Sequence, residues 1–155
     1  MPKIAFICTG NICRSPFAEH LLRNLAPKGW NLEVVSYGIM TTDGQEVSDT
    51  GSIVALEEGL DVSSHRSRAL RPSELRDCDL IFTMTKAQKF HLELAMPDIR
   101  DRIFCLTEFG REGKRVQDVD DPMGGDLSVY RKCFKRIREE IERTLPLLGS
   151  HFGLR

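Results

Sequence analysis

Short apolar runs alternate with segments of helical periodicity along this 155-residue chain, and this alternation limits its possible folds more than any other feature. The apolar runs that predict strands are residues 4–8, 32–37, 79–84 and 102–106. Such continuous runs are typical of parallel strands that are buried on both faces and connected by helices. The chain is therefore predicted to be an α/β protein, a doubly wound three-layer sandwich around a four-stranded parallel sheet.

The expected helices follow these strands in turn. Ser15 is the expected cap of the first helix, and the proline after it stands where a missing N–H is tolerated. The second helix follows the Gly/Thr/Asp-rich stretch 41–51. Its expected apolar positions are Ile53, Leu56 and Leu60. Thr85 is the expected cap of the third helix, which runs to about Ala95, and the last helix covers 127–148.

Length and composition indicate one ordinary domain over residues 1–155. Apolar residues make up 41% and charged residues 29%, the balance of a folded chain rather than a disordered one. The net charge of −1 argues against a nucleic-acid binder and against a polybasic membrane-surface protein. No run reaches the roughly 20 apolar residues of a membrane span, and the N-terminus lacks a signal-peptide pattern, so we expect a cytoplasmic protein.

The five cysteines, an odd number without a secretory signal, do not predict a disulfide framework. None forms a C-x-x-C pair, and no cluster of cysteine and histidine completes a zinc site in the sequence. Cys105 and Cys133 lie in apolar periodic stretches, where a buried packing role is expected. Cys8 and Cys13 differ because of the residues around them.

The first strand is joined to the first helix by the segment Cys8-Thr9-Gly10-Asn11-Ile12-Cys13-Arg14-Ser15. A helix N-terminus offers unpaired N–H donors and a positive dipole end, and both favour a bound phosphate. Gly10 and Asn11 tolerate positive φ, so the loop can curl with its N–H groups pointing inward. Residues 9–15 are thus the predicted phosphate-binding cradle. Cys8 is the predicted nucleophile, because the same donors stabilise its thiolate.

Arg14 is the predicted clamp for the phosphate. It stands six positions after Cys8, from which it can reach back across the loop and bind two phosphate oxygens in a fork. Ser15 can hydrogen-bond the thiolate directly. The competing interpretation is a buried cysteine at a strand end and a surface arginine in the first helical turn. An arginine there opposes the helix dipole unless an anion is bound, which disfavours that interpretation.

Asp121 is the predicted general acid, which a thiolate attack on phosphorus needs for the departing oxygen. Pro122 favours an extended Asp121, and the two glycines that follow Met123 permit a sharp turn. The loop before the last helix is expected on the same rim of the sheet as the cradle. An Asp-Pro pair can also be only a turn before a helix, and Asp120 is the rival acid.

The motif Cys-Thr-Gly-Asn-Ile-Cys-Arg-Ser-Pro, with Asp-Pro before the final helix, resembles the low-molecular-weight protein tyrosine phosphatase family. The resemblance runs from Ile4 to about Leu147, and with it we expect the strand order 2-1-3-4. It implies that Cys8 is the nucleophile, Arg14 the clamp, and Asp121 the acid and later the base. The implied reaction is hydrolysis of phosphotyrosine in a protein through a phosphocysteine.

The resemblance also implies supporting roles around the loop. Asn11, Ser15 and His65 match family positions that hydrogen-bond one another and hold the loop in shape. Without that match, His65 would be interpreted as a solvated loop residue. Cys13 matches a second loop cysteine that, in several relatives, traps oxidised Cys8 as a disulfide; packing beneath the loop is the alternative.

Ile12, Met123 and Thr42 are the residues expected to shape the substrate slot. Tyrosine-specific relatives often have aromatic residues after Asp-Pro and after the second strand, where this chain has Met123-Gly124 and approximately Thr41-Thr42. Residues 82–86 and 121–125 look closer to a bacterial branch of the family that includes protein-arginine phosphatases. In that branch a threonine of the cradle contacts the guanidinium phosphate. Ile12 stands there instead and suits a phenyl ring, so we expect phosphotyrosine, with phosphoarginine as the alternative.

Two further functions are disfavoured. A thioredoxin-coupled arsenate reductase has a similar loop but needs two more cysteines close together, whereas those at 78, 105 and 133 are widely spaced. A non-catalytic phosphate-binding module would lack Cys8, Arg14 or the Asp-Pro acid, and all are present. We therefore expect an enzyme without metal or cofactor that binds phosphate or another oxyanion in its loop and works as a monomer.

Overall fold

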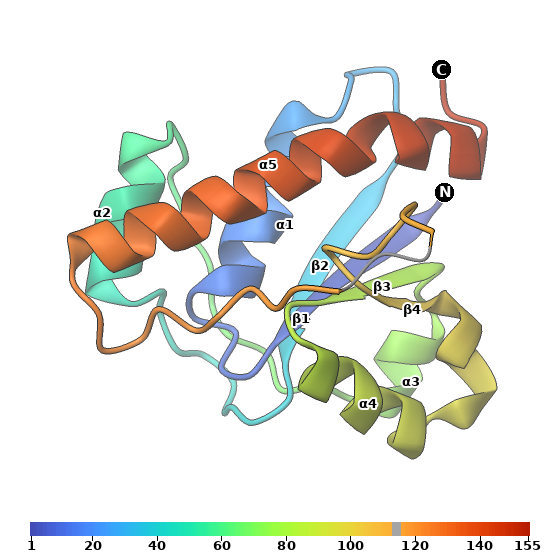
Figure 1. The fold of residues 1–155 in the computed structure, drawn as a ribbon, viewed down its shortest axis with the longest axis horizontal. Helices are drawn as coiled ribbons and strands as arrows, with labels where there is room; N and C mark the ends of the chain where they lie inside the picture. Colours follow the sequence, from blue (N-terminus) through green and yellow to red (C-terminus); the bar gives the residue numbers. More distant parts are fainter. Residues whose placement is uncertain (113–115) are drawn as a thin grey trace.

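The computed structural model describes residues 1–112 and 116–155 and has an α/β fold (Figure 1). The strands are β1 (Lys3–Cys8), β2 (Glu33–Gly38), β3 (Leu80–Thr83) and β4 (Ile103–Cys105). The helices are α1 (Arg14–Leu25), α2 (Asp49–Glu57), α3 (Pro72–Arg76), α4 (Lys86–Ala95) and α5 (Leu127–Phe152). A 3₁₀ helix, η1, covers Pro97–Arg102.

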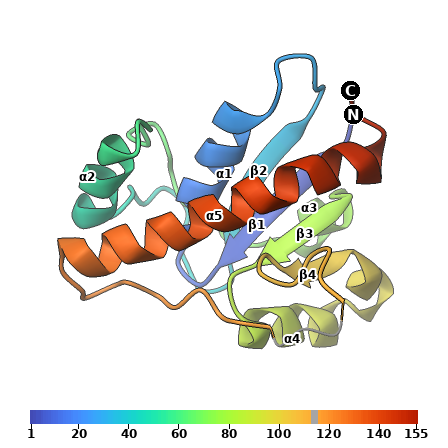
Figure 2. The same cartoon turned by 45° about the horizontal axis from the view of Figure 1, so that its top comes forward.

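The strands form one parallel sheet in the order β2-β1-β3-β4. Helices α1 and α5 cover one face of the sheet and α3 and α4 the other, whereas α2 rests against α5 (Figure 2). The predicted doubly wound three-layer fold and strand order are therefore confirmed. In this arrangement the loop after β1 and the segment before α5 reach the same edge of the sheet (Figure 1).

Both faces of β1 are buried, which explains its continuous apolar sequence. Ile4, Phe6 and Cys8 belong to the core beneath α1 and α5. Ala5 and Ile7 belong to the core beneath α3 and α4. Because side chains alternate along a strand, Cys8 lies in the same layer as α1, the helix whose first turn follows the loop.

The apolar positions predicted for α2 are wrong. Ile53 is 49% exposed and Leu56 62%, while Leu60 is buried but lies beyond the end of the helix. The buried residues of α2 are Gly51, Val54 and Ala55. A Cβ added to Gly51 would lie 3.5 Å from the ring of Tyr130 in α5. The buried side of α2 thus carries short side chains and one valine, and the longer apolar side chains of Ile53 and Leu56 point to solvent.

The cap predicted at Ser15 is also wrong, because α1 begins at Arg14, two residues before the predicted first helical residue, Pro16. Cys13 occupies the cap position without a side-chain hydrogen bond to the first turn, and Ser15 lies inside that turn. The hydroxyl of Ser15 instead contacts the sulfur of Cys8. The cap predicted at Thr85 is confirmed, since Thr85 and Gln88 form a reciprocal capping box at the start of α4.

Other differences concern boundaries. Helix α5 continues to Phe152, where Gly153 ends it with a φ of 64°. The short elements α3 and η1 have no counterpart in the sequence prediction, because pieces of this length carry little periodicity. The polar loop expected before α5 includes residues 113–115, which lie outside the described residues.

Within the part of the chain that is described, no helix has the length and apolar character to cross a bilayer.

Candidate active site

The connection from β1 to α1 lies at the carboxyl edge of the sheet, where parallel α/β proteins bind ligands. Cys8 is the last residue of β1 and Arg14 the first of α1, so residues 9–13 join them. The chain that leaves β2 supports this connection, because the N–H of Met40 donates to Thr9 O at 2.9 Å. The nucleophile and the clamp predicted from the sequence are thus at the two ends of one short loop.

Asn11 gives this loop its curl. Its φ of 54° is left-handed, and it is the one non-glycine position with a positive φ among the described residues. Asn11 O accepts a hydrogen bond from His65 Nε2, and Asn11 Oδ1 accepts one from the N–H of Arg68, both at 2.9 Å. In this conformation the N–H of Asn11 points inward and donates to Cys8 Sγ at 3.2 Å.

Ser15 is the second donor to that sulfur. Asn11 Nδ2 donates to Ser15 Oγ at 2.8 Å, which leaves the hydroxyl proton free to point to Cys8 Sγ, 2.9 Å away. The Cys8 sulfur thus has two hydrogen-bond partners within the loop. The structure also brings together Asn11, Ser15 and His65, the three residues assigned to loop support.

Ser36 and Glu19 extend this network and are absent from the sequence prediction. Asn11 Nδ2 also donates to Ser36 Oγ at 2.9 Å, and Ser36 Oγ donates to Glu19 Oε1 at 2.5 Å. Glu19 is only 7% exposed. Their sequence signals are weak but present: a serine within the apolar run of β2, and a glutamate on the buried side of α1 between Phe17 and Leu21.

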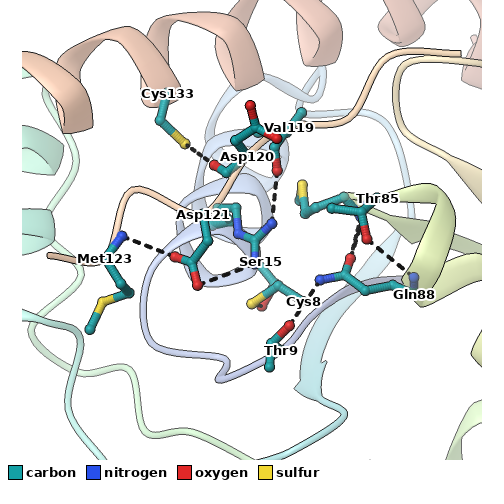
Figure 3. Close-up of polar contacts among 12 residues, drawn as sticks. Cys8, Thr9, Ser15, Thr85, Gln88, Val119, Asp120, Asp121, Met123 and Cys133 are labelled. Atoms are coloured by element: carbon teal, nitrogen blue, oxygen red, sulfur yellow. Dashed lines mark hydrogen bonds and ion pairs between the residues drawn. The ribbon is translucent and has the colours of Figure 1, made fainter. Parts of the chain in front are cut away.

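Gln88 of α4 also supports the loop, through its contact with Thr9 (Figure 3). Its buried side chain accepts hydrogen bonds from the N–H groups of Met84 and Thr85, and its Nε2 donates to Thr9 Oγ1 at 3.2 Å. The signal that could have identified it is the spacing of Thr85 and Gln88, which is that of a capping box.

The guanidinium of Arg14 links the loop after β1 to the segment before α5. Arg14 is 3% exposed. Its Nη1 donates to Val119 O at 2.8 Å, and its Nη2 lies 3.7 Å from Asp121 Oδ2. A buried charge needs such partners, and the backbone bond fixes the plane of the guanidinium. Arg14 therefore supplies a positive field at the position where the sequence predicted the phosphate clamp.

Asp121, rather than Asp120, faces Arg14. The Asp121 side chain is 47% exposed, and its Oδ1 accepts a hydrogen bond from the N–H of Met123 at 3.0 Å, which holds the carboxylate in a turn. The backbone carbonyl of Asp120 contacts Cys133 Sγ at 3.7 Å (Figure 3). The two aspartates thus lie in different surroundings, although they are adjacent in the sequence.

A pocket of about 120 Å³ opens over the Cys8 sulfur. It is lined by Cys8, Thr9, Gly10, Ile12, Cys13, Arg14, Asp121 and Met123. Ile12 and Met123 provide apolar walls, and Tyr130 Oη contacts Met123 Sδ at 3.1 Å. The pocket thus combines a thiol, a guanidinium and a carboxylate with two apolar side chains.

Thr42, the third residue predicted to shape the substrate slot, is not among the described residues that line this pocket. Its carbonyl accepts a hydrogen bond from Ser67 Oγ at 2.7 Å, and its hydroxyl accepts one from Gln45 Nε2 at 3.1 Å. Met40 and Ser48, at the two ends of this connection, bond the cradle through their backbone N–H groups, to Thr9 O and Ile12 O, and Met40 is 77% exposed. The loop after β2 therefore presents Met40 rather than Thr42 to the rim.

Cys13 is buried at the start of α1, and burial raises the pKa of its thiol. Burial also raises the pKa of Cys133 to about 12. Cys105 and Cys133 are buried, which confirms their predicted packing role. All five cysteines are free in the structure.

The family model for low molecular weight phosphotyrosine protein phosphatases matches residues 3–151. This chain belongs to that family. Members are hydrolases of phosphoric monoesters, and the family resemblance expected from the loop motif is confirmed.

The relatives of this phosphatase carry two kinds of name. It is 34% identical over 150 residues to a protein-arginine-phosphatase of Geobacillus stearothermophilus, covering 96% of this chain and 94% of the relative. It is 33% identical over 141 residues to the low molecular weight protein-tyrosine-phosphatase PtpB of Staphylococcus epidermidis, covering 91% and 95%. The solved structure of the arginine phosphatase YwlE of Geobacillus stearothermophilus superimposes with a TM-score of 0.89 at 31% identity, covering 97% and 95%.

Proposed function

We propose that this phosphatase hydrolyses phosphotyrosine in proteins and that Cys8 is its nucleophile. One observation supports this best: the pocket over the Cys8 sulfur has a cation and an acid beside the sulfur and the apolar side chains of Ile12 and Met123 in its walls. A phosphate group fits the charged part, and a phenyl ring suits the apolar part.

In the first step, the Cys8 thiolate attacks phosphorus in line with the tyrosyl oxygen. A sulfur–phosphorus bond forms while the bond from phosphorus to that oxygen breaks, and Asp121 gives the oxygen its proton. The N–H groups of the loop and the guanidinium of Arg14 stabilise the charge on the equatorial oxygens, so the electrostatic part of this step needs no metal.

In the second step, the Asp121 carboxylate takes a proton from water, and the oxygen of that water attacks the phosphocysteine. The sulfur–phosphorus bond breaks, inorganic phosphate leaves, and the Cys8 thiolate is restored. Asp121 suits both proton transfers because its half-exposed carboxylate has access to solvent.

Phosphoarginine is the second candidate substrate, because relatives at 34% identity carry the name arginine phosphatase. A guanidinium phosphate needs hydrogen-bond acceptors or donors beside the phosphate, whereas Ile12 offers only an apolar side chain at the pocket wall. The Ile12 side chain therefore favours phosphotyrosine.

The test is a comparison of kcat/KM for phosphotyrosine, phosphoarginine and phosphoserine peptides of one sequence. We expect phosphotyrosine to be preferred, and Ile12→Thr to raise the phosphoarginine-to-phosphotyrosine ratio by about tenfold. Ile53→Thr, an exposed isoleucine of α2, is the matched control and should leave the ratio unchanged. A preference for phosphoarginine in the unaltered protein would replace the proposed substrate, and an unchanged ratio in Ile12→Thr would clear Ile12 of this role.

We also propose that the protein binds phosphate or other oxyanions in residues 9–15 and acts as a monomer in the cytoplasm. Five free cysteines support a reducing compartment, in which thiols persist. Sedimentation at several concentrations tests the monomer, and protection of the protein from thermal unfolding by phosphate or vanadate tests oxyanion binding.

A further inference from the structure

A second group of ligating side chains lies beneath the phosphate-binding loop. Glu19, His20 and His65 each place one potential ligand atom within 4.8 Å of those of the other two. Glu19 and His20 are adjacent on α1, and His65 follows α2. The two imidazole rings meet edge to face with centroids 5.9 Å apart, and a hollow of about 330 Å³ opens beside all three side chains.

The hydrogen bonds of the two imidazoles leave one nitrogen of each available. His20 Nδ1 lies 2.9 Å from Pro16 O, and His65 Nε2 lies 2.9 Å from Asn11 O. A carbonyl oxygen only accepts, so these two nitrogens carry the protons. In the neutral rings, His20 Nε2 and His65 Nδ1 therefore have free lone pairs. Histidines that ligate metals commonly donate their other ring N–H to a carbonyl in this way.

Glu19 adds a buried negative charge to the two imidazoles. Its Oε1 accepts a hydrogen bond from Ser36 Oγ and its Oε2 accepts one from Arg23 Nη2. A carboxylate has about four acceptor positions, so these two bonds leave a lone pair on either oxygen for a cation.

We propose that Glu19, His20 and His65 form a zinc site outside the catalytic pocket. Imidazole and carboxylate are typical zinc donors, and three protein ligands leave the fourth tetrahedral position to water. With bonds of about 2.0–2.1 Å, tetrahedral ligand atoms lie about 3.4 Å apart, so the ligand atoms close by up to about 1.4 Å on binding. His20, the one partly exposed member, has the most room to make this movement.

Three arginines border the hollow and oppose a bound cation: Arg23, Arg66 and Arg68. Two are engaged elsewhere, since Arg66 bonds two backbone carbonyls and the Arg68 guanidinium lies 5.1 Å over the Tyr37 ring. Arg23 pairs with Glu19 itself and therefore competes directly with the ion for that carboxylate. We therefore expect weaker zinc binding than at a structural zinc site, where no such charges compete.

The zinc site is connected to the phosphate-binding loop through two of its ligands. His65 donates to Asn11 O, and Ser36 joins Glu19 to the side-chain amide of Asn11. A bound ion therefore constrains Asn11, the residue with the left-handed backbone. Control of the phosphatase through this contact rests on the proposed function, whereas zinc binding itself does not.

Zinc binding is measured by titration calorimetry in a reduced Cys8→Ser background, because a thiolate at Cys8 would itself hold zinc. We expect one ion per chain, and we expect His20→Ala in that background to weaken the affinity at least about tenfold. Glu19→Gln, which keeps an acceptor for Ser36 but removes the charge, should weaken it as well. His91→Ala removes an exposed imidazole from α4 and is the matched control, with unchanged affinity expected.

Nitrogen NMR of the histidine rings locates the ion without any replacement in the cluster. Zinc added to the Cys8→Ser protein should shift the ring signals of His20 and His65 and leave those of His91 and His151 in place. Equal affinity in His20→Ala and its Cys8→Ser parent would overturn the proposal. Failure of the Cys8→Ser protein to bind zinc would overturn it too, and neither result depends on phosphatase activity.

Discussion

The phosphate-binding loop, residues 8–15, and the acid loop, residues 119–123, meet at one pocket but are built in different ways. In the first, Asn11 and Ser15 are fully buried and hydrogen-bond each other, and two donors reach the Cys8 sulfur. In the second, the Asp121 side chain is 47% exposed and is held by a local turn. This difference suits the proposed roles: the groups proposed to be in place before the reaction are buried, and the carboxylate proposed to exchange protons with water is at the surface.

The largest expected effect comes from removing the nucleophile of the buried loop. Cys8→Ser should lower turnover of p-nitrophenyl phosphate by at least about 10⁴-fold while vanadate binding persists, because Arg14 and the loop amides remain. Steady-state kinetics and vanadate titration by fluorescence measure the two effects. Turnover retained in Cys8→Ser would show that Cys8 is not the nucleophile. The comparison of a buried nucleophile loop with an exposed acid loop would then no longer hold.

Replacing the exposed acid should have a smaller effect that depends on the substrate. Asp121→Ala is expected to slow phenyl phosphate by about 10²–10⁴-fold and p-nitrophenyl phosphate much less, because p-nitrophenolate leaves without a proton. Asp120→Ala, the neighbouring carboxylate, is the matched control and should behave like the unaltered protein. Equal losses on both substrates in Asp121→Ala would mean that another residue is the acid. A larger loss on phenyl phosphate than on p-nitrophenyl phosphate in Asp120→Ala would identify Asp120 as the acid.

Stability should separate the two loops more clearly than activity does. Asn11→Ala removes the side-chain hydrogen bonds to Ser15, Ser36 and the N–H of Arg68 and puts alanine at a φ of 54°, so it should lower the free energy of unfolding by about 2–4 kcal/mol. Asp121→Ala and the exposed Asn31→Ala should each change it by less than about 0.5 kcal/mol. Urea denaturation measures all three variants. A similar loss in Asn11→Ala and Asn31→Ala would contradict the idea that the first loop is rigid.

The smallest expected effect concerns oxidation of the buried loop. Peroxide converts the Cys8 thiolate to a sulfenic acid, and we propose that Cys13 then attacks this sulfur, releasing water and forming a disulfide. Because burial raises the pKa of Cys13, its thiolate fraction at neutral pH is small, and disulfide formation should speed up as the pH rises.

Mass spectrometry after peroxide should find the Cys8–Cys13 disulfide, and added thiol should restore activity. Cys13→Ser should lower the recovered activity a few-fold at moderate peroxide, whereas Cys105→Ser, which removes a buried cysteine outside the pocket, should not. Full recovery in Cys13→Ser would assign Cys13 to packing alone.

Sequence patterns predicted most of the fold, because the strands and the larger helices have local signals. The burial of β1 on both faces matches its continuous apolar run, and Thr85 caps α4 as expected. The face of α2 could not be predicted in this way. Its buried face consists of Gly51, Val54 and Ala55, whereas its longest apolar side chains, Ile53 and Leu56, are exposed, so the hydrophobic pattern points to the wrong face.

The sequence by itself determined the chemistry at the end of β1, since Cys8, Arg14 and the left-handed Asn11 lie within one short loop whose geometry is local. Only the tertiary structure decided what lies beneath that loop. Ser36 and Glu19 reach it from separate segments, and His65, expected there only from the family resemblance, lies 54 positions after its partner Asn11. Contacts at such separation depend on how the layers pack, and periodicity along one segment carries no information about its neighbours in space.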